Sequence, residues 1–469
     1  MKNYTINEFI GGVSGQRNKG PRGSFSFGQN LDIHNDDGLL TTNQKLKKDS
    51  GDIVVDLPLA MFRASDGAMY AFGNTGKIYR KASDGSWILA YTDTDGKITG
   101  ASEYENNNGG GSYSRYIYWA TRYKLKRILL SSAGGEWSPT EVGTFKVAGL
   151  LNYHTMRVAA GWLMIADGDR VAIVDREDAF NNEALLISTG NTIKPMIDKS
   201  EQLIMGTQDD VLNGWIFTWN KLLDSWTDKT PVQAKEVNAI GFLEGGLLMQ
   251  VGQRGRLKWW NFSDSHPLKK IPDTNYAEPG AVDEYRGMLH IGMSGGTKDG
   301  VYSIGREDNN NPLAVNLEYI PSHGKITGGV IGAMAKDGSD LYVAWKYGKT
   351  YGIDMVDSNN KANGLLESLE FDGGQPETTK RISTIKVITK PLPANCTISV
   401  KYKTNRDTDW IETEMSDGRS AMDEGDIVGI FNAEAEGESY QVQLTLTASA
   451  NNAPEIYSIN NYFTEGTNL

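Results

Sequence analysis

The fold can be inferred from one stretch of sequence, Trp162-Leu163-Met164-Ile165-Ala166-Asp167-Gly168 followed by Arg170-Val171-Ala172-Ile173-Val174. Two apolar runs joined by an Asp-Gly turn are typical of a β-hairpin. The same unit recurs along the chain, and its seven copies begin near residues 69, 116, 162, 203, 247, 288 and 341. Because a spacing of roughly 40 to 53 residues is the period of a four-stranded propeller blade, the repeat predicts an all-β protein with a β-propeller of about seven such blades.

The repeat also predicts where the blade strands lie. The paired strands are 69–74 with 76–80, 116–120 with 124–128, 162–168 with 170–174, 203–207 with 215–219, 247–252 with 255–260, 288–292 with 300–304, and 341–345 with 351–355. Three blades have flanking strands as well, at 60–63 and 87–91, at 156–159 and 184–187, and at 331–334 and 365–369. A β-sandwich or two unrelated β domains is the alternative, but seven serial units at one period favour the propeller.

Small residues end the first strand of several pairs: Gly73, Ala120, Gly206, Gly252 and Gly292. A glycine cradle for a ligand is one interpretation of these positions. They recur about once per repeat, however, which indicates crowded packing between strands.

The composition limits the class of protein. Hydrophobic residues make up 39% of the 469 residues, which is enough for a substantial core and excludes global disorder. The lone Cys396 excludes intramolecular disulfides and a cysteine-built metal site. No apolar run has the length of a signal peptide or approaches the roughly 18 residues of a membrane span, so we expect a soluble protein without a membrane partner. The net charge of −12 disfavours the wrapping of nucleic acid.

The two ends of the chain differ from the repeat. Residues 1–50 are glycine-rich and mildly basic, which predicts an N-terminal arm, and Gly38–Thr42 within it is a candidate for the strand that closes the ring. An arm that reaches onto a neighbouring subunit is the alternative. Gly373–Pro376 is the best linker in the chain, so we expect the propeller over residues 51–375 and a further domain over residues 376–469.

Plain two-residue alternation begins beyond this linker. Ile398, Val400 and Tyr402 share one face of a predicted strand, and the residues between them are polar. Residues 440–447 repeat this pattern, and a last strand covers residues 455–459. About six such strands predict a small antiparallel β-sandwich with one dry and one wet face on each sheet.

Metal-binding and catalytic signatures are missing from the sequence, so we predict no catalytic, cofactor-binding or metal-binding residue and leave the binding residues unknown. The five histidines, His34, His154, His266, His290 and His323, have no zinc-site spacing, and His290 lies within a predicted core strand. Asp93–Gly96 and Asp167–Asp169 resemble pieces of calcium loops but lack the distal glutamate, so we interpret both as turns. Cys396 has no histidine nearby, and Gly109–Gly111 is interpreted as a long exposed loop.

Glycoside hydrolysis is the enzymatic alternative, because it needs two carboxylates about 5–10 Å apart that separate blades could supply. Ser83–Trp87 is one degenerate match to the Asp-box turn of sialidase-like propellers. The densest aromatic group, Trp215–Trp219 with Trp226 and the pair Trp259-Trp260, could stack on sugars. Adjacent strand residues point to opposite faces, so at most one of Trp259 and Trp260 faces a groove, and packing between blades explains most of the group.

Three parts of the chain resemble known virion proteins. Residues 300–306 with 309–319 resemble structural proteins of tailed bacteriophages, residues 440–446 with 454–459 are similar to the closing strands of many phage tail proteins, and residues 28–32 with 38–40 resemble the start of phage propeller proteins. The resemblance implies a structural component of a phage tail, such as a tail nozzle or tail-tip part or a connector-proximal ring. It supplies no catalytic residue and no cofactor.

The resemblance also implies partners and a place of action. The expected partners are further copies in a cyclic homo-oligomer and other tail or connector proteins, with DNA passing the acidic wall without specific binding. The expected location is the virion tail, after synthesis in the host cytoplasm. A receptor- or glycan-binding tail-tip adhesin is the alternative, with its specificity in loops 105–114, 209–213 and 308–312.

Overall fold

The computed structural model describes residues 2–16, 18–35, 38–107, 113–147, 153–209 and 213–465. Within these ranges the chain forms β-strands and one 3-10 helix, η1 (Leu130–Ser132), which confirms the all-β class. No helix in these ranges is long and apolar enough to cross a membrane. The chain forms two compact units: unit 1 contains Met1–Lys47, Val301–Ser322 and Val356–Leu469, and unit 2 contains Lys48–Gly300 and His323–Met355.

Unit 2 is built from consecutive antiparallel sheets, each an up-and-down run of neighbouring strands. Five sheets have four strands: β8 (Pro58–Arg63), β9 (Met69–Gly73), β10 (Lys77–Lys81) and β11 (Trp87–Thr92); β12 (Ile98–Asn107), β13 (Tyr113–Thr121), β14 (Lys124–Leu129) and β15 (Thr140–Thr144); β16 (Met156–Ala159), β17 (Trp162–Asp167), β18 (Arg170–Val174) and β19 (Phe180–Leu186); β20 (Asn191–Lys199), β21 (Gln202–Asp209), β22 (Trp215–Asn220) and β23 (Asp228–Pro231); β24 (Val237–Leu243), β25 (Gly246–Val251), β26 (Arg256–Trp260) and β27 (Ser265–Lys270). After them, β28 (Tyr276–Tyr285) pairs with β29 (Met288–Ser294), and β32 (Gly329–Asp337), β33 (Asp340–Tyr347) and β34 (Thr350–Lys361) pair in order.

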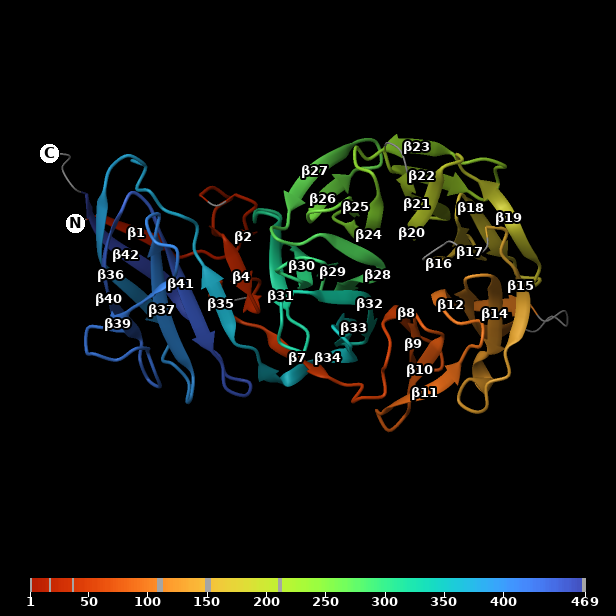
Figure 1. Ribbon diagram of the computed structural model, residues 1–469, viewed down its shortest axis with the longest axis horizontal. Coiled ribbons are helices and arrows are strands. Elements are labelled where there is room, and N and C mark those ends of the chain that lie inside the picture. Colours follow the sequence, from red (N-terminus) through yellow and green to blue (C-terminus); the bar gives the residue numbers. More distant parts are fainter. Residues whose placement is uncertain are drawn as a thin grey trace. The chain divides into compact units, whose positions relative to one another are not determined.

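The first strands of the seven sheets form a ring. Each of β8, β12, β16, β20, β24, β28 and β32 contacts the next, and β32 contacts β8, so the sheets stand around a common axis (Figure 1). This arrangement is a seven-bladed β-propeller.

The core of the propeller lies between blades. One cluster of buried side chains joins β9 and β10 to β12–β14, another joins β17 and β18 to β20–β22, and a third joins the seventh sheet to the first. Neighbouring residues of one strand take part in different joints: Met164 of β17 packs toward the fourth blade, whereas Leu163 and Ile165 pack toward the second. Because both faces of each sheet are buried in this way, the strands are continuously apolar and not alternating.

The predicted hairpins are strands in the structure, and six of the seven pairs have antiparallel registers. The strands of the sixth pair, β29 and β30 (Gly300–Gly305), belong to different units. Five of the six predicted flanking strands are β8, β11, β16, β19 and β32. The sixth, at 365–369, was wrong: β35 (Gly364–Glu367) pairs with β41 and β4 of unit 1, because its partners are remote in sequence and its apolar pattern does not identify them.

Unit 1 has two sheets that share one apolar core. The first has the order β1 (Lys2–Ile6), β42 (Ile456–Glu465), β36 (Lys380–Thr389), β40 (Val428–Gly437) and β39 (Glu414–Met415). The second has the order β38 (Ile411–Glu412), β37 (Thr397–Thr404), β41 (Tyr440–Thr447), β35, β4 (Phe27–Gln29), β31 (Ala314–Tyr319) and β30. Short pairs are β2 (Gly12–Val13) with β3 (Ser24–Phe25) and β5 (Leu31–Asp32) with β6 (Thr41–Thr42), and β7 covers Gln44–Lys48. The predicted sandwich is therefore present, and Ile398, Val400 and Tyr402 face its core as expected.

The compact units do not follow the order of the chain. β1, from the predicted arm, pairs along its whole length with β42, and Leu40 bridges to Ile456. The predicted linker Gly373–Pro376 lies within unit 1, directly after Phe371, which bridges to Tyr440. Thr41 and Thr42 of the candidate ring-closing stretch pair with β5. Pairings over several hundred residues, and not local composition, decide which segments form a unit.

Two of the small residues at strand ends, Gly206 and Gly292, lie where neighbouring blades meet, whereas a Cβ on Gly252 would meet only Ala234 at 3.8 Å, and Gly252 instead has a positive φ of 56°, so the expectation of crowding was wrong there. A Cβ atom on Gly292 would lie 2.4 Å from Cγ2 of Ile331, and one on Gly206 would lie 2.7 Å from Cγ1 of Val237. Ile331 lies in β32, the inner strand of the next blade, and Val237 is the first residue of β24, the inner strand of the blade after Gly206. The interpretation of these two glycines as packing positions is confirmed.

We expect Gly292→Ala to destabilise the propeller by about 1–3 kcal/mol, because the added methyl group has to displace Ile331 of the next blade. Thermal unfolding monitored by circular dichroism measures the effect. The matched control is Gly135→Ala, where a Cβ meets only an oxygen at 3.8 Å and no positive φ opposes it. Equal midpoints for the two variants would contradict the crowded joint.

Candidate functional site

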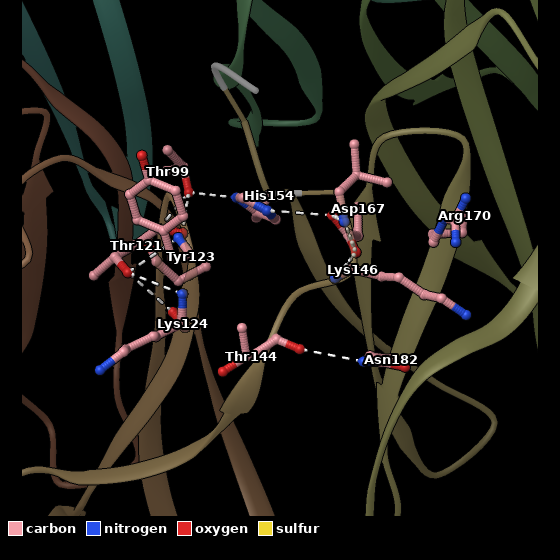
Figure 2. A network of polar contacts seen from close by, with 12 residues as sticks. Thr99, Thr121, Tyr123, Lys124, Thr144, Lys146, His154, Asp167, Arg170 and Asn182 are labelled. Atoms are coloured by element: carbon pink, nitrogen blue, oxygen red, sulfur yellow. Dashed lines mark hydrogen bonds and ion pairs between the residues drawn. The ribbon is translucent and has the colours of Figure 1, made fainter. Parts of the chain in front are cut away.

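A buried polar network joins the second and third blades (Figure 2). Nδ1 of His154 is hydrogen-bonded to Oγ1 of Thr99 at 2.6 Å, and its Nε2 lies 3.8 Å from Oδ1 of Asp167. The imidazole stacks on Phe145 with 4.2 Å between ring centroids. Asp167 in turn accepts the backbone N–H of Lys146 at 2.9 Å. The network holds the turn after β17, the segment before β16 and the inner strand β12 together.

His154 is fully buried, and burial lowers its pKa, while the neighbouring Asp167 opposes that shift. The imidazole is therefore neutral at pH 7. Since no solvent reaches it and its neighbours belong to the scaffold, its role is structural. A buried histidine can also serve in catalysis, but the His154 ring packs between two blades, against Thr99 and Phe145.

Two further buried carboxylates, Asp56 before the first blade and Asp93 between the first and second blades, also accept hydrogen bonds. Asp56 accepts hydrogen bonds from the Tyr79 hydroxyl at 2.6 Å and the Thr75 hydroxyl at 2.7 Å. Asp93 accepts the indole N–H of Trp119 at 2.7 Å and forms a 2.7 Å ion pair with Lys126. The Lys126 ammonium thus holds the position between Asp93 and Asp95 that a calcium ion would need, and the interpretation of this segment as a turn is confirmed.

The other residues singled out by type are mostly structural. His290 is buried in β29 with an edge-on contact to Tyr285, as expected for a core histidine. His323 is stacked on Tyr347, and burial lowers its pKa to about 4. Cys396 is buried. No group of three potential metal ligands exists among the described residues.

The tryptophans of the aromatic group and the Asp-box-like turn lie in different surroundings. Trp219 is buried between the third and fourth blades and Trp260 between the fourth and fifth, and Trp259 donates its N–H to Leu243 O at 3.2 Å. Trp215 is half-buried under the Lys229 ammonium. Asp84 accepts the Ser86 N–H in an exposed hairpin turn. The expectation that interblade packing explains most of these tryptophans is confirmed.

One cavity of about 340 Å³ lies at the axis of the propeller, and we refer to it as the axial pocket. Its lining comes from five inner strands and their flanks: Leu59–Arg63 of β8, Thr99–Ser102 of β12, Tyr153 and Thr155–Arg157 at β16, Pro279, Gly280, Val282 and Asp283 of β28, and Met334–Lys336 of β32. Thr99 links this lining to the His154 network.

Glycines let the inner strands converge on one side of the axis. A Cβ on Gly280 would lie 2.3 Å from Leu59 O, and one on Gly332 would lie 2.2 Å from Pro58 O. As a result β28 contacts β8 as well as its ring neighbour β32. The charged residues of the lining are Arg63, Arg157, Asp283 and Lys336.

The charged groups of the axial pocket differ in their partners. Arg63 forms a 2.9 Å ion pair with Asp337. Asp283 accepts the backbone N–H groups of Glu284 and Lys336, each at 2.8 Å, and burial raises its pKa. These contacts fix the two acidic groups to the scaffold.

Further ionisable groups lie on or near the inner strands, and one of them, Tyr153, belongs to the lining of the axial pocket. The Tyr153 hydroxyl donates to the Glu278 carboxylate, and burial raises the pKa of Glu278 to about 7. Lys194 pairs with Glu236 at 2.6 Å. Sequence reasoning missed these groups because they come from different blades, and no local spacing brings them together.

The chain matches no known protein-family model and no curated protein sequence. Solved structures with a similar fold include the WD40 β-propeller domain of Doa1, at 11% identity and a TM-score of 0.46, covering 67% of this chain and 96% of that one. The WD40 repeats of RRP9 match at 11% identity and a TM-score of 0.47, covering 67% and 99% of the two chains. The extracellular domain of the putative hybrid two component system BT4673 from B. thetaiotaomicron matches at 14% identity and a TM-score of 0.46, covering 72% and 43%.

These likenesses concern the fold alone. Because all three TM-scores lie below 0.5, the propeller assignment depends on the strand pairings and joints described above.

Buried His154 is expected to reduce the free energy of unfolding as the pH falls below 6.5; buried His323 acts in the same direction, whereas Glu278, with its raised pKa, opposes both. The lowered pKa of His154 keeps its ring neutral in the folded protein, whereas the unfolded chain takes up the proton below 6.5. The resulting loss is up to about 1.4 kcal/mol per pH unit. Unfolding midpoints of the wild type, His154→Gln and the control His266→Gln, at an exposed position, measure it between pH 7.5 and 5, in roughly half-unit steps. His154→Gln is expected to reduce the fall of the unfolding midpoint between pH 6.5 and 5. The same fall in the wild type and in His154→Gln would show that His154 does not cause it.

Proposed function

We propose that the protein is a structural component of a bacteriophage tail, in a nozzle, a tail tip or a ring near the connector. The observation that carries the proposal is where the three phage-like segments lie. Residues 28–32, 309–319 and 440–446 are far apart in sequence, yet all belong to unit 1 and contribute β4, β31 and β41 to one sheet. Of the companion segments, 300–306 contributes β30 to the same sheet with Gly300 in unit 2, 454–459 enters β42 of the other sheet of unit 1, and 38–40 lies in unit 1 outside this sheet.

The pairing between these segments is specific. Gln29 of β4 pairs with Leu317 of β31 and with Leu365 of β35, and β35 pairs with β41. The Asn316 side chain donates to Leu31 O at 2.7 Å inside the sheet. Three loose resemblances that build a single structural element support a common origin better than three scattered ones would.

The proposed mechanism is assembly. Copies of the protein form a closed cyclic ring, in which weak contacts repeated around the symmetry axis add up to a durable structure. Other tail or connector proteins are the remaining partners. The net charge of −12 suits a wall that DNA passes without adhering. The proposed location is the virion tail.

A receptor- or glycan-binding tail-tip adhesin is the second candidate, and one cavity favours it. This cavity, of about 540 Å³, is lined by Tyr104, Tyr113, Arg115 and Arg176 among others. Tyr113 is 57% exposed and lies within the predicted specificity loop 105–114. An exposed aromatic ring beside charged groups suits a saccharide. Residues 108–112 and 210–212 of the predicted loops lie outside the described residues.

We expect mass spectrometry of purified particles of the encoding phage to detect this chain, and portal, tube or tape-measure genes to flank its gene. Native mass spectrometry of the full chain is expected to detect a closed oligomer. Particles that lack the protein would overturn the proposal.

A glycan array with the full chain tests the second candidate. Binding that Tyr113→Ala abolishes, with Tyr123→Ala as an exposed aromatic control, would favour the adhesin. Release of reducing sugar from a bound glycan would instead indicate a glycan-cleaving enzyme.

A further inference from the structure

We propose that the axial pocket of unit 2 binds a small organic anion, a molecule with one carboxylate or phosphate group, and that Arg157 is its principal ligand. This inference is independent of the tail assignment, since it concerns a cavity within the propeller and not an assembly surface.

The proposal rests on the position and the contacts of the Arg157 side chain. It is half-buried and lines the axial pocket. Its Nη1 donates to Met156 O at 3.0 Å, and no carboxylate of the described residues lies within 4.0 Å of its guanidinium nitrogens. A guanidinium has five N–H donors, and the bond to Met156 O uses one of them, so four donors could bind a ligand. The Asp198 and Asp283 carboxylates attract this guanidinium only from beyond contact distance. A partly desolvated cation compensated in this incomplete way is costly, and a ligand oxyanion in direct contact would reduce that cost.

The neighbouring charges favour an anion. Lys336 also lines the pocket, whereas the charge of Arg63 is matched by Asp337. Asp283 is the acidic group of the lining, and each of its oxygens accepts a backbone N–H, which offsets part of its charge. The pocket therefore carries one excess positive charge in a protein whose net charge is −12. Walls of low dielectric focus such a local field.

Size and wall chemistry indicate the class of ligand. A cavity of about 340 Å³ is at the lower end of the range for small-molecule sites, which suits a molecule of about one sugar ring. Met61, Phe62 and Met334 provide an apolar wall for its body. A planar guanidinium binds carboxylate and phosphate in the same two-pronged manner, so both groups fit.

The test is calorimetric titration of the full chain at constant ionic strength with glucuronate, glucose 1-phosphate and inorganic phosphate. Glucose is the neutral control, and the two sugar anions distinguish carboxylate from phosphate. We expect at least one of the sugar anions to bind, and Arg157→Met to weaken that binding by about tenfold or more. The matched control is Arg170→Met, an arginine of unit 2 that pairs with Glu183 at 2.6 Å outside the pocket and is expected to leave binding unchanged.

A second measurement avoids dependence on the folding of the variant. An arginine-specific dicarbonyl reagent, followed by peptide mass spectrometry of the wild type, is expected to modify Arg157 and to do so more slowly when the anion that binds is present. Absence of binding by both sugar anions, equal binding by Arg157→Met, or modification of Arg157 at the same rate with and without the anion would overturn the proposal.

Discussion

Closure of the ring between β32 and β8 is the contact on which the propeller depends. Each blade buries both faces, so any open joint would expose two apolar sheets to water. At the closing joint, Met61 and Tyr79 of the first blade pack with Tyr342 and Ile353 of the seventh. Apolar burial contributes about 25 cal/mol for each Å² removed from water, and the ring is the arrangement that leaves no blade face uncovered.

Buried polar groups at the joints add specificity to this non-directional force. Asp56, Asp93 and Asp167 lie in turns or segments beside the strand ends, and each accepts hydrogen bonds from neighbouring segments. An unsatisfied carboxylate at such a depth would be costly, so these contacts allow one register between blades. The same logic makes Arg157 conspicuous, because it lines the axial cavity and no ion pair within 4.0 Å joins it to a carboxylate of the described residues, so that Asp198 and Asp283 attract it only from a greater distance.

The two units show how far chain order and spatial order diverge. β1 pairs with β42, and β4 pairs with β31, so unit 1 depends on contacts between residues hundreds of positions apart. Such pairings are slow to form because loop closure precedes any gain from the contact. They also explain why β35, an apolar segment directly after the seventh hairpin, joined the sandwich and not the blade.

The hairpin repeat, the approximate number of blades and the alternation of β37 could be predicted from the amino acids alone, because these are local patterns of strand burial. The amino-acid sequence also identified Gly206 and Gly292 as packing positions, since their spacing matches the repeat. Only the tertiary structure decided which segments form unit 1, which aspartates lie at joints, and that Arg157 lines an axial cavity with Lys336. Those features bring together side chains from separate blades, and no spacing along one strand encodes where another strand will lie.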